Sequence, residues 1–165
     1  SNVALPPAVI NPYCFTPAIA PHLAAAEAGI AIDFARIIAA CTAARQQSDL
    51  LIVEGVGGFR VPLGVDRDST DLAVALGLPV ILVVGLRLGC INQALLAGEA
   101  IARRGLELAG WVANCIDPAM THQDENIEAL ASRLAGPLLG VVPHVPGSDP
   151  GVAAGHLVLP SVPGI

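Results

Sequence analysis

The chain has 165 residues, 54% hydrophobic and 13% charged, which is enough apolar material for one buried core and excludes global disorder. Fourteen acidic residues against eight basic ones give a formal net charge of −6, which disfavours non-specific binding to nucleic acid or to an anionic membrane. No apolar run is long enough for a transmembrane helix, and the first residues do not have the pattern of a signal peptide, so we expect a cytoplasmic protein.

Helical and apolar segments alternate along the chain. The expected elements, in chain order, are helices at 21–28 and 33–47, a strand at 50–53, a helix at 68–76, a strand at 79–84, a helix at 91–104, a strand at 108–116, a helix at 121–134 and a strand at 138–142. The Pro- and Gly-rich tail after the last strand, residues 146–165, is expected to be irregular. We treat residues 1–165 as a single domain.

Polar residues at the helix starts supply the expected caps. Asp33 can cap the helix at 33–47, and Asp68 or Ser69 can cap the helix at 68–76. Thr121 followed by Asp124 forms a weak capping-box pattern before the helix at 121–134. Such local signals fix helix starts independently of the rest of the chain.

Fully apolar strands separated by helices predict an α/β fold with a mostly parallel sheet and helices on both faces. In such sheets, ligands bind at the carboxyl ends of the strands. The residues at these ends are Glu54, Gly85 and Asn114. We therefore expect them to face the ligand.

An acidic residue ends the apolar run at 50–53. Glu54 has the position of the acid of a Walker B strand, where a carboxylate can hold Mg²⁺ beside nucleotide phosphates. The following glycines, Gly55, Gly57 and Gly58, allow backbone N–H groups to approach an anion. The alternative is a solvated acid in an ordinary glycine-rich turn.

The start of the helix at 91–104 is a candidate anion site. The free amides around Gly89, Cys90, Ile91 and Asn92 and the positive end of the helix dipole could hold a phosphate or a carboxylate. An ordinary connection between strand and helix is the alternative.

Side chains near the other strand ends could also bind a ligand. The Asn114 amide carries both a donor and an acceptor and can pair with the edge of adenine, although it could also be a simple turn residue. His22 and His144 could act as acid–base groups, but isolated histidines more often only face solvent or form a structural hydrogen bond.

Two compositional features limit the chemistry. The four cysteines, Cys14, Cys41, Cys90 and Cys115, have no metal-ligand spacing and are expected to be buried, reduced thiols. All eight basic residues are arginines, and the chain contains neither a lysine nor a P-loop motif. A Walker-B-like strand without a P-loop is anomalous.

Several segments together resemble the dethiobiotin synthetase family. The sequence Val-Glu-Gly-Val-Gly-Gly at 53–58 with Val-Pro-Leu at 61–63 is similar to a family signature, and residues 79–92 resemble the family over their whole length. Residues 110–114 and 138–143 also match, as do 11–13 with 21–22. The resemblance covers about residues 8–155.

The resemblance implies a P-loop NTPase-like fold that lacks its first strand and P-loop in these 165 residues. It also implies a homodimeric ligase of biotin synthesis that uses ATP and Mg²⁺. This enzyme closes the ureido ring of dethiobiotin from 7,8-diaminopelargonic acid and CO₂, through a carbamate that ATP phosphorylates. Because the expected catalytic lysines are absent, we expect no catalytic residue in this chain and no activity from it alone.

The resemblance also implies roles for individual residues. Glu54 corresponds to the Mg²⁺-associated acid and Gly57 to a backbone contact near the substrate. Asn114 corresponds to the residue that binds adenine, with Pro143 and Val145 beside the base. The substrate carboxylate is expected at a helix N-terminus that reaches across the homodimer, formed by Gly89, Cys90, Ile91 and Asn92.

Two other functions remain open from the sequence. The chain could be a non-catalytic dimeric binding module derived from the same fold. It could also belong to another amide-forming P-loop ligase, of the type that amidates cobyrinic acid. In the dimer, we expect the apolar residues Leu86, Leu88 and Ile91 to lie at or near the interface.

Overall fold

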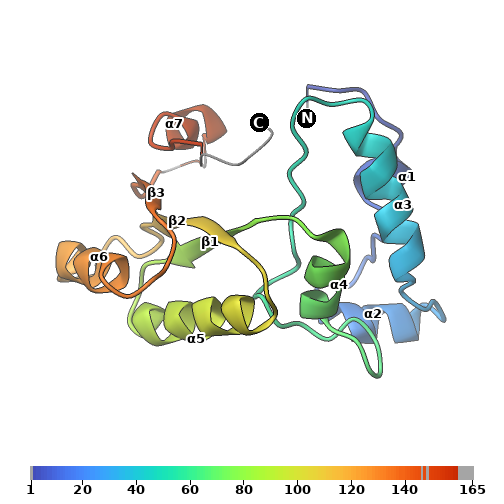
Figure 1. Ribbon diagram of the computed structural model, residues 1–165, viewed down its shortest axis with the longest axis horizontal. Coiled ribbons are helices and arrows are strands. Elements are labelled where there is room, and N and C mark those ends of the chain that lie inside the picture. The colour runs from blue at the N-terminus through green and yellow to red at the C-terminus, as the bar shows by residue number, and fades with distance from the viewer. Residues whose placement is uncertain (1, 146, 148, 160–165) are drawn as a thin grey trace. The chain divides into compact units, whose positions relative to one another are not determined.

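The computed structural model describes residues 2–145, 147 and 149–159 (Figure 1). The chain divides into two compact units, Ser1–Gly77 and Leu78–Gly164. Within the described residues, no helix is both long and apolar enough to span a membrane.

The first unit is helical. Its helices are α1 (Pro7–Ile10), α2 (Pro21–Glu27), α3 (Phe34–Arg45) and α4 (Ser69–Leu76). Helix α3 packs against both α1 and α4. The helices expected at 21–28, 33–47 and 68–76 are confirmed.

The predicted caps of α3 and α4 both form. The Asp33 carboxylate accepts a hydrogen bond from the N–H of Ala35 at 2.9 Å. The Asp68 carboxylate accepts from the N–H groups of Thr70 and Asp71, and the Asp71 carboxylate accepts from the N–H of Asp68. This reciprocal pair is a capping box and fixes the start of α4.

The strand expected at 50–53 is wrong for this structure. Residues 50–55 form no strand, and most of their apolar side chains lie exposed, Ile52 to 74%. A strand is stabilised by hydrogen bonds to a neighbouring strand, and no described residue pairs with this segment. The apolar pattern was therefore not sufficient to make a strand.

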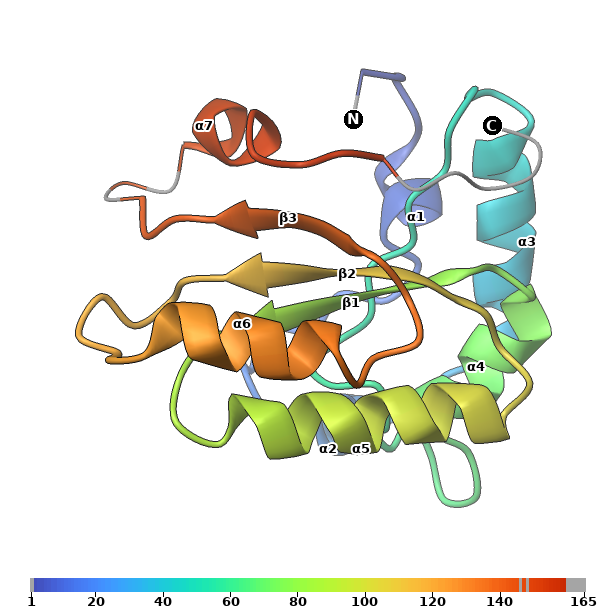
Figure 2. The same ribbon diagram turned by 60° about the vertical axis from the view of Figure 1, so that its left-hand side comes forward.

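The second unit contains the parallel sheet, in the order β1-β2-β3 (Figure 2). The strands are β1 (Val80–Gly85), β2 (Leu108–Asn114) and β3 (Leu138–Val142), and the connections contain α5 (Cys90–Arg103) and α6 (Gln123–Ala131). The parallel α/β fold class is confirmed, as are the elements expected between residues 79 and 142.

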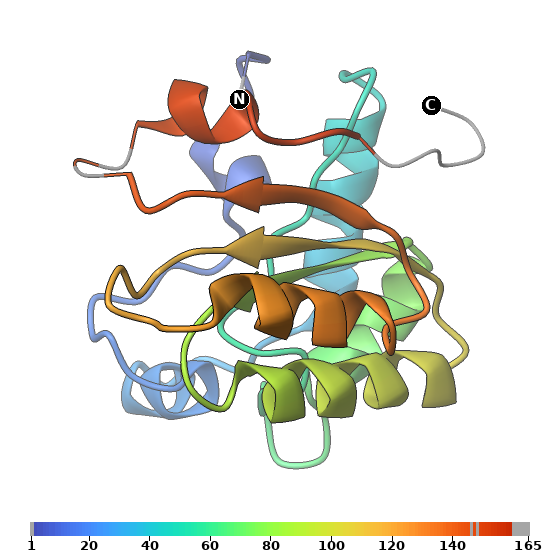
Figure 3. The ribbon, with the colours of Figure 1, turned by 90° about the vertical axis from the view of Figure 1, so that its left-hand side faces the viewer.

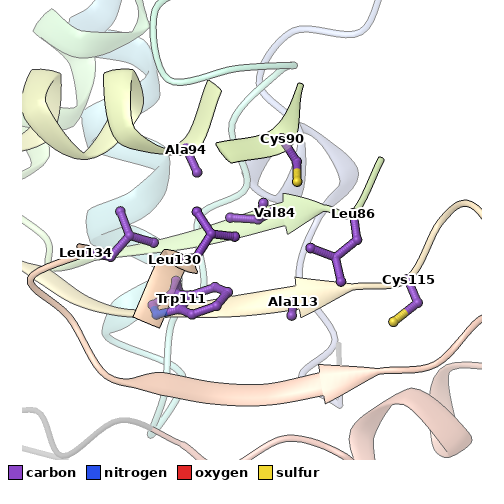
Figure 4. Packing of buried hydrophobic residues seen from close by; sticks show 9 residues of the cluster. All are labelled: Val84, Leu86, Cys90, Ala94, Trp111, Ala113, Cys115, Leu130 and Leu134. Atoms are coloured by element: carbon purple, nitrogen blue, oxygen red, sulfur yellow. The ribbon is translucent and has the colours of Figure 1, made fainter. Parts of the chain in front are cut away.

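Helices α5 and α6 cover the same face of this sheet (Figure 3). Between them and the strands lies a core centred on the fully buried Trp111, Leu86 and Leu130 (Figure 4). Ile81 and Val83 alternate with the buried residues of β1 and lie on the other face, where both are exposed. We call this second face the open face of the sheet within this unit.

The start of α6 differs from the expected capping box. The N-cap is His122 rather than Thr121, with a φ of 57°, and its ring nitrogen Nδ1 lies 3.0 Å from Oε1 of Glu125. The Asn126 amide donates to the His122 carbonyl at 2.7 Å. These side-chain contacts make His122 the N-cap, one residue later than expected, so the predicted capping box of Thr121 and Asp124 is wrong.

The tail contains more structure than its composition suggests. Helix α7 (Pro150–Ala154) is capped by the Asp149 carboxylate, and the chain then returns antiparallel to β3. Leu157 forms a bridge with Gly140, and the Val158 N–H donates to the Leu139 carbonyl at 2.8 Å. Residues 146, 148 and 160–165 of the expected irregular tail lie outside the described residues.

Candidate functional site

The carboxyl ends of the three strands lie side by side in the second unit. Asn114 at the end of β2 is in register with Gly85 of β1 and with Val142 of β3. The sequence-based expectation that Gly85 and Asn114 share one edge is therefore confirmed. Glu54 belongs to the first unit.

The backbone around Asn114 is firmly held. Its carbonyl accepts hydrogen bonds from the N–H of Leu86 at 2.7 Å and from the N–H of Ile116 at 2.9 Å. The next residue, Cys115, donates its N–H to the Val142 carbonyl at 2.9 Å. The half-buried Asn114 amide itself has no hydrogen-bond partner among the described residues, so it can pair with a ligand.

The residues after β3 follow directly on the strand that neighbours Asn114. Pro143 and His144 are exposed and Val145 is half-buried. Because Val142 is the register partner of Asn114, this segment leaves the sheet at the same edge as the Asn114 amide.

The start of α5 presents free backbone donors. Gly89 is the N-cap with a φ of 94°, and no side chain caps the helix. The N–H of Cys90 donates to the Arg87 carbonyl, whereas those of Ile91 and Asn92 have no acceptor among the described residues. Two free amides at the positive end of a 14-residue helix are a chemically suitable site for an anion.

The three apolar side chains expected near a dimer interface lie in different environments. Leu86 is fully buried in the core, so the expectation that it contributes to an interface is wrong. Ile91 lies in the first turn of α5, where it is half-buried against the core, and its place near an interface stays a prediction. Leu88 is 98% exposed and is the apolar residue of this loop that another molecule could contact.

The glycine-rich loop of the first unit is shaped by hydrogen bonds that its sequence did not predict. The Ser69 hydroxyl donates to the Phe59 carbonyl at 2.7 Å and accepts from the Val61 N–H at 2.8 Å. The Arg60 guanidinium pairs with the Asp68 carboxylate at 3.0 Å. Gly57 has a φ of 77°, and Glu54 is exposed in the unpaired segment before it. The only sequence signal for this arrangement is the capping box that begins at Asp68.

The cysteines and histidines divide by environment. Cys90 and Cys115 are buried and therefore poorly accessible, and burial raises the pKa of the Cys115 thiol, which makes Cys115 a poor nucleophile. The expectation that all four cysteines are buried is wrong for Cys14, which is exposed in an irregular segment, and is met only in part by Cys41, which is half-buried. His22 lies in α2, where its Nδ1 is buried without a hydrogen-bond partner.

A further residue at the strand-end edge was missed from the sequence. Ile116 lies two residues after Asn114, and its side chain occupies the space above Gly85. An ideal Cβ atom on Gly85 would lie 2.7 Å from Cδ1 of Ile116. The only sequence feature that pointed to this contact was a glycine, Gly85, at the end of an apolar strand.

Known proteins match nearly the whole chain. The family model described as "AAA domain" matches residues 3–151. The ATP-dependent dethiobiotin synthetase BioD of Aromatoleum aromaticum is 65% identical over 92% of this chain and 67% of its own length. The protein of the same name from a Janthinobacterium species is 50% identical over 99% of this chain and 69% of its own length. The chain therefore belongs to the family of ATP-dependent dethiobiotin synthetases, with a P-loop NTPase-like fold.

Proposed function

We propose that the protein closes the ureido ring of dethiobiotin from 7,8-diaminopelargonic acid and CO₂. One amine forms a carbamate with CO₂, and a carbamate oxygen takes the γ-phosphoryl group of ATP. The second amine then attacks the carbonyl carbon, and phosphate leaves. The observation that carries this proposal is the 65% identity to a dethiobiotin synthetase over 92% of the chain.

In this proposal the strand-end edge of the second unit binds the adenine base. The Asn114 amide donates to and accepts from the edge of the base, and Pro143 and Val145 lie beside it. The hydrogen bonds that hold the Asn114 backbone support this role, because they place the amide before ATP arrives. Asn114→Ala should raise the KM for ATP and leave the KM for the diamine unchanged.

The start of α5 binds the carboxylate of the substrate. The free N–H groups of Ile91 and Asn92 point out of the helix start, and the Gly89 and Cys90 backbone shapes the approach to them. The Cys90 thiol takes no part, since it lies in the core. We propose that this helix start serves the neighbouring subunit of a cytoplasmic homodimer, with Leu88 in the subunit contact, and that Gly57 contributes a backbone contact to the substrate.

Glu54 is the residue of this chain that would hold Mg²⁺. No group of three or more His, Cys, Asp or Glu side chains comes together among the described residues, so no site made of protein ligands alone is present there. A single exposed carboxylate fits Mg²⁺ nevertheless, because this ion is commonly held by one or two carboxylates with water and phosphate oxygens completing the shell. Bound there, Mg²⁺ would neutralise charge on the phosphates.

A polypeptide of these 165 residues alone is expected to be inactive. Phosphoryl transfer depends on backbone donors and a lysine around the phosphates, and the sequence contains no lysine. Arginine elsewhere in the chain does not replace a lysine held in a phosphate loop. A preparation of verified mass that turned over the diamine would contradict this expectation.

Gly89 allows a sharp test of the carboxylate site in the full-length enzyme. Gly89→Asp places a negative charge at the helix start, whereas Gly89→Asn has nearly the same shape without the charge. Both residues tolerate the left-handed backbone better than other side chains, and no atom lies within 4 Å of the added Cβ. The Asp variant should raise the KM for the diamine about three- to tenfold above that of the Asn variant.

The KM for ATP should be the same in the two variants. Equal losses for both ligands, or no difference between Asp and Asn, would contradict the assignment of the carboxylate to α5. A monomer in sedimentation at micromolar concentration would contradict the homodimer.

A further inference from the structure

Gly85 and Ile116 form a contact that depends on the missing side chain of the glycine. A Cβ atom on Gly85 would lie 3.4 Å from Cγ1 of Ile116 and only 2.7 Å from Cδ1, which is closer than ordinary contact. The absence of a Cβ therefore lets the Ile116 side chain lie directly over the end of β1. Ile116 nevertheless remains 42% exposed, so most of one side of it is available for contact.

The contact with Gly85 places the Ile116 side chain on the same face of the sheet as the Asn114 amide. Trp111, Ala113 and Cys115 all point into the core beneath α5 and α6 (Figure 4). Because successive side chains of a strand alternate, Asn114 points to the open face of the sheet. Its register partner Gly85 also faces that side, and Ile116 lies over Gly85, so the side chains of Asn114 and Ile116 are neighbours there.

An amide beside an exposed aliphatic side chain is a suitable pair for a nucleobase. A base has hydrogen-bonding groups only at its edge, and its two faces are apolar. An amide that binds the edge therefore leaves a face that gains from burial against apolar atoms. Ile116 supplies such atoms on the same strand end as the amide.

We infer that Ile116, held over Gly85, packs against a face of the adenine base and determines a large part of the affinity for ATP. The inference rests on the proposed function, since it deepens the assignment of the base site to Asn114. Ile116 acts through direct contact with the nucleotide. Gly85 is a positioning residue, which acts only through Ile116.

Binding of ATP and of inorganic tripolyphosphate to the full-length enzyme tests this role. Ile116→Ala removes most of the apolar contact and should weaken ATP binding about tenfold, as expected for the loss of roughly two buried methylene groups. Tripolyphosphate has no base, so its affinity should not change. Ile116→Leu keeps the apolar contact and should restore most of the ATP affinity.

Ile81→Ala is the matched control. Ile81 is the same residue type on the open face of the same sheet and is 43% exposed, but it lies at the beginning of β1. The Ile81→Ala variant should bind ATP and tripolyphosphate with the same affinity as the wild type. Gly85→Ala provides a second variant, because its Cβ displaces only the flexible end of Ile116; it should weaken ATP binding with little change in thermal stability.

The outcomes separate the inference from the proposed function. A wild-type enzyme that does not bind ATP would overturn the proposed function itself. If the wild type binds ATP and Ile116→Ala binds it equally well, the function stands and the role of Ile116 is refuted. Equal weakening of ATP and tripolyphosphate would also refute it, since the variant would then have loosened the whole strand-end edge.

Discussion

Gly140 is the position at which one added methyl group should release the tail from the sheet. The Cβ of Gly140→Ala would overlap the carbonyl oxygen of His156 and lie 3.1 Å from Cδ2 of Leu157. The first of these atoms belongs to the backbone, so no side-chain rotation can remove the clash. The segment after α7 must therefore move away from β3.

The expected loss of stability is limited by what holds the tail. Release of this segment breaks the hydrogen bond from Val158 to Leu139, at a net cost of about 1 kcal/mol. Alanine is also strained at the φ of 156° that Gly140 adopts, which costs about 1 kcal/mol. Leu157 is only partly buried and adds less than about 1 kcal/mol. We expect the free energy of unfolding to fall by about 2–3 kcal/mol, because the rest of the sheet stays intact.

Chemical unfolding of the Gly140→Ala variant measures this loss, and two further glycine substitutions provide its lower and upper reference values. Gly58→Ala meets no atom within 4 Å and should change stability by less than about 0.5 kcal/mol. Gly136 is buried in the connection before β3, and the Cβ of Gly136→Ala would lie 2.7 Å from the Leu108 carbonyl oxygen and 3.0 Å from Cα of Gly110. Both atoms belong to the backbone of β2, so this substitution should cost more than about 3 kcal/mol.

Hydrogen exchange at the Val158 amide reports the tail directly. In Gly140→Ala this amide should lose its protection, while amides of β2 keep theirs. Wild-type stability with a protected Val158 amide would refute the reasoning. A loss as large as that of Gly136→Ala would show instead that the tail is an integral part of the sheet.

Three other predictions concern stability. Ser69→Ala removes a hydroxyl that joins two backbone groups of the preceding loop, so chemical unfolding should show a loss of about 1–3 kcal/mol, and wild-type stability would contradict the bridge. Leu86→Ala should cost about 2–5 kcal/mol, whereas the exposed Leu96→Ala should change little; equal effects would contradict the assigned core. Hydrogen bonds hold the pKa of the Asp68 carboxyl group below its usual value, and the one from the Thr70 hydroxyl has the largest effect. The ionised carboxylate therefore stabilises the fold fully above about pH 5, and this stabilisation is lost as the pH falls through about 4 toward the lowered pKa of the folded state. Asp68→Asn should accordingly make the free energy of unfolding less sensitive to acid, as measured by unfolding at a series of pH values.

The sequence by itself determined the features that depend on near neighbours. Apolar runs of strand length and the caps Asp33 and Asp68 predicted most helices and strands, because periodicity and capping act within a few residues. Alternating strands and helices likewise fixed the parallel sheet and the edge shared by Gly85 and Asn114. The free amides at the start of α5 were also predictable from the sequence, because the first N–H groups of any helix have no acceptor within that helix.

Only the tertiary structure decided the features that depend on distant partners. Residues 50–53 have a strand pattern but no partner strand, and Leu86 is buried because of where α5 crosses the sheet. The contact of Ile116 with Gly85 depends on the register of β1 with β2, and the return of the tail along β3 depends on Gly140. The local residue pattern does not specify these particular contacts, because hydrogen bonding and packing between distant segments form only once those segments meet in space.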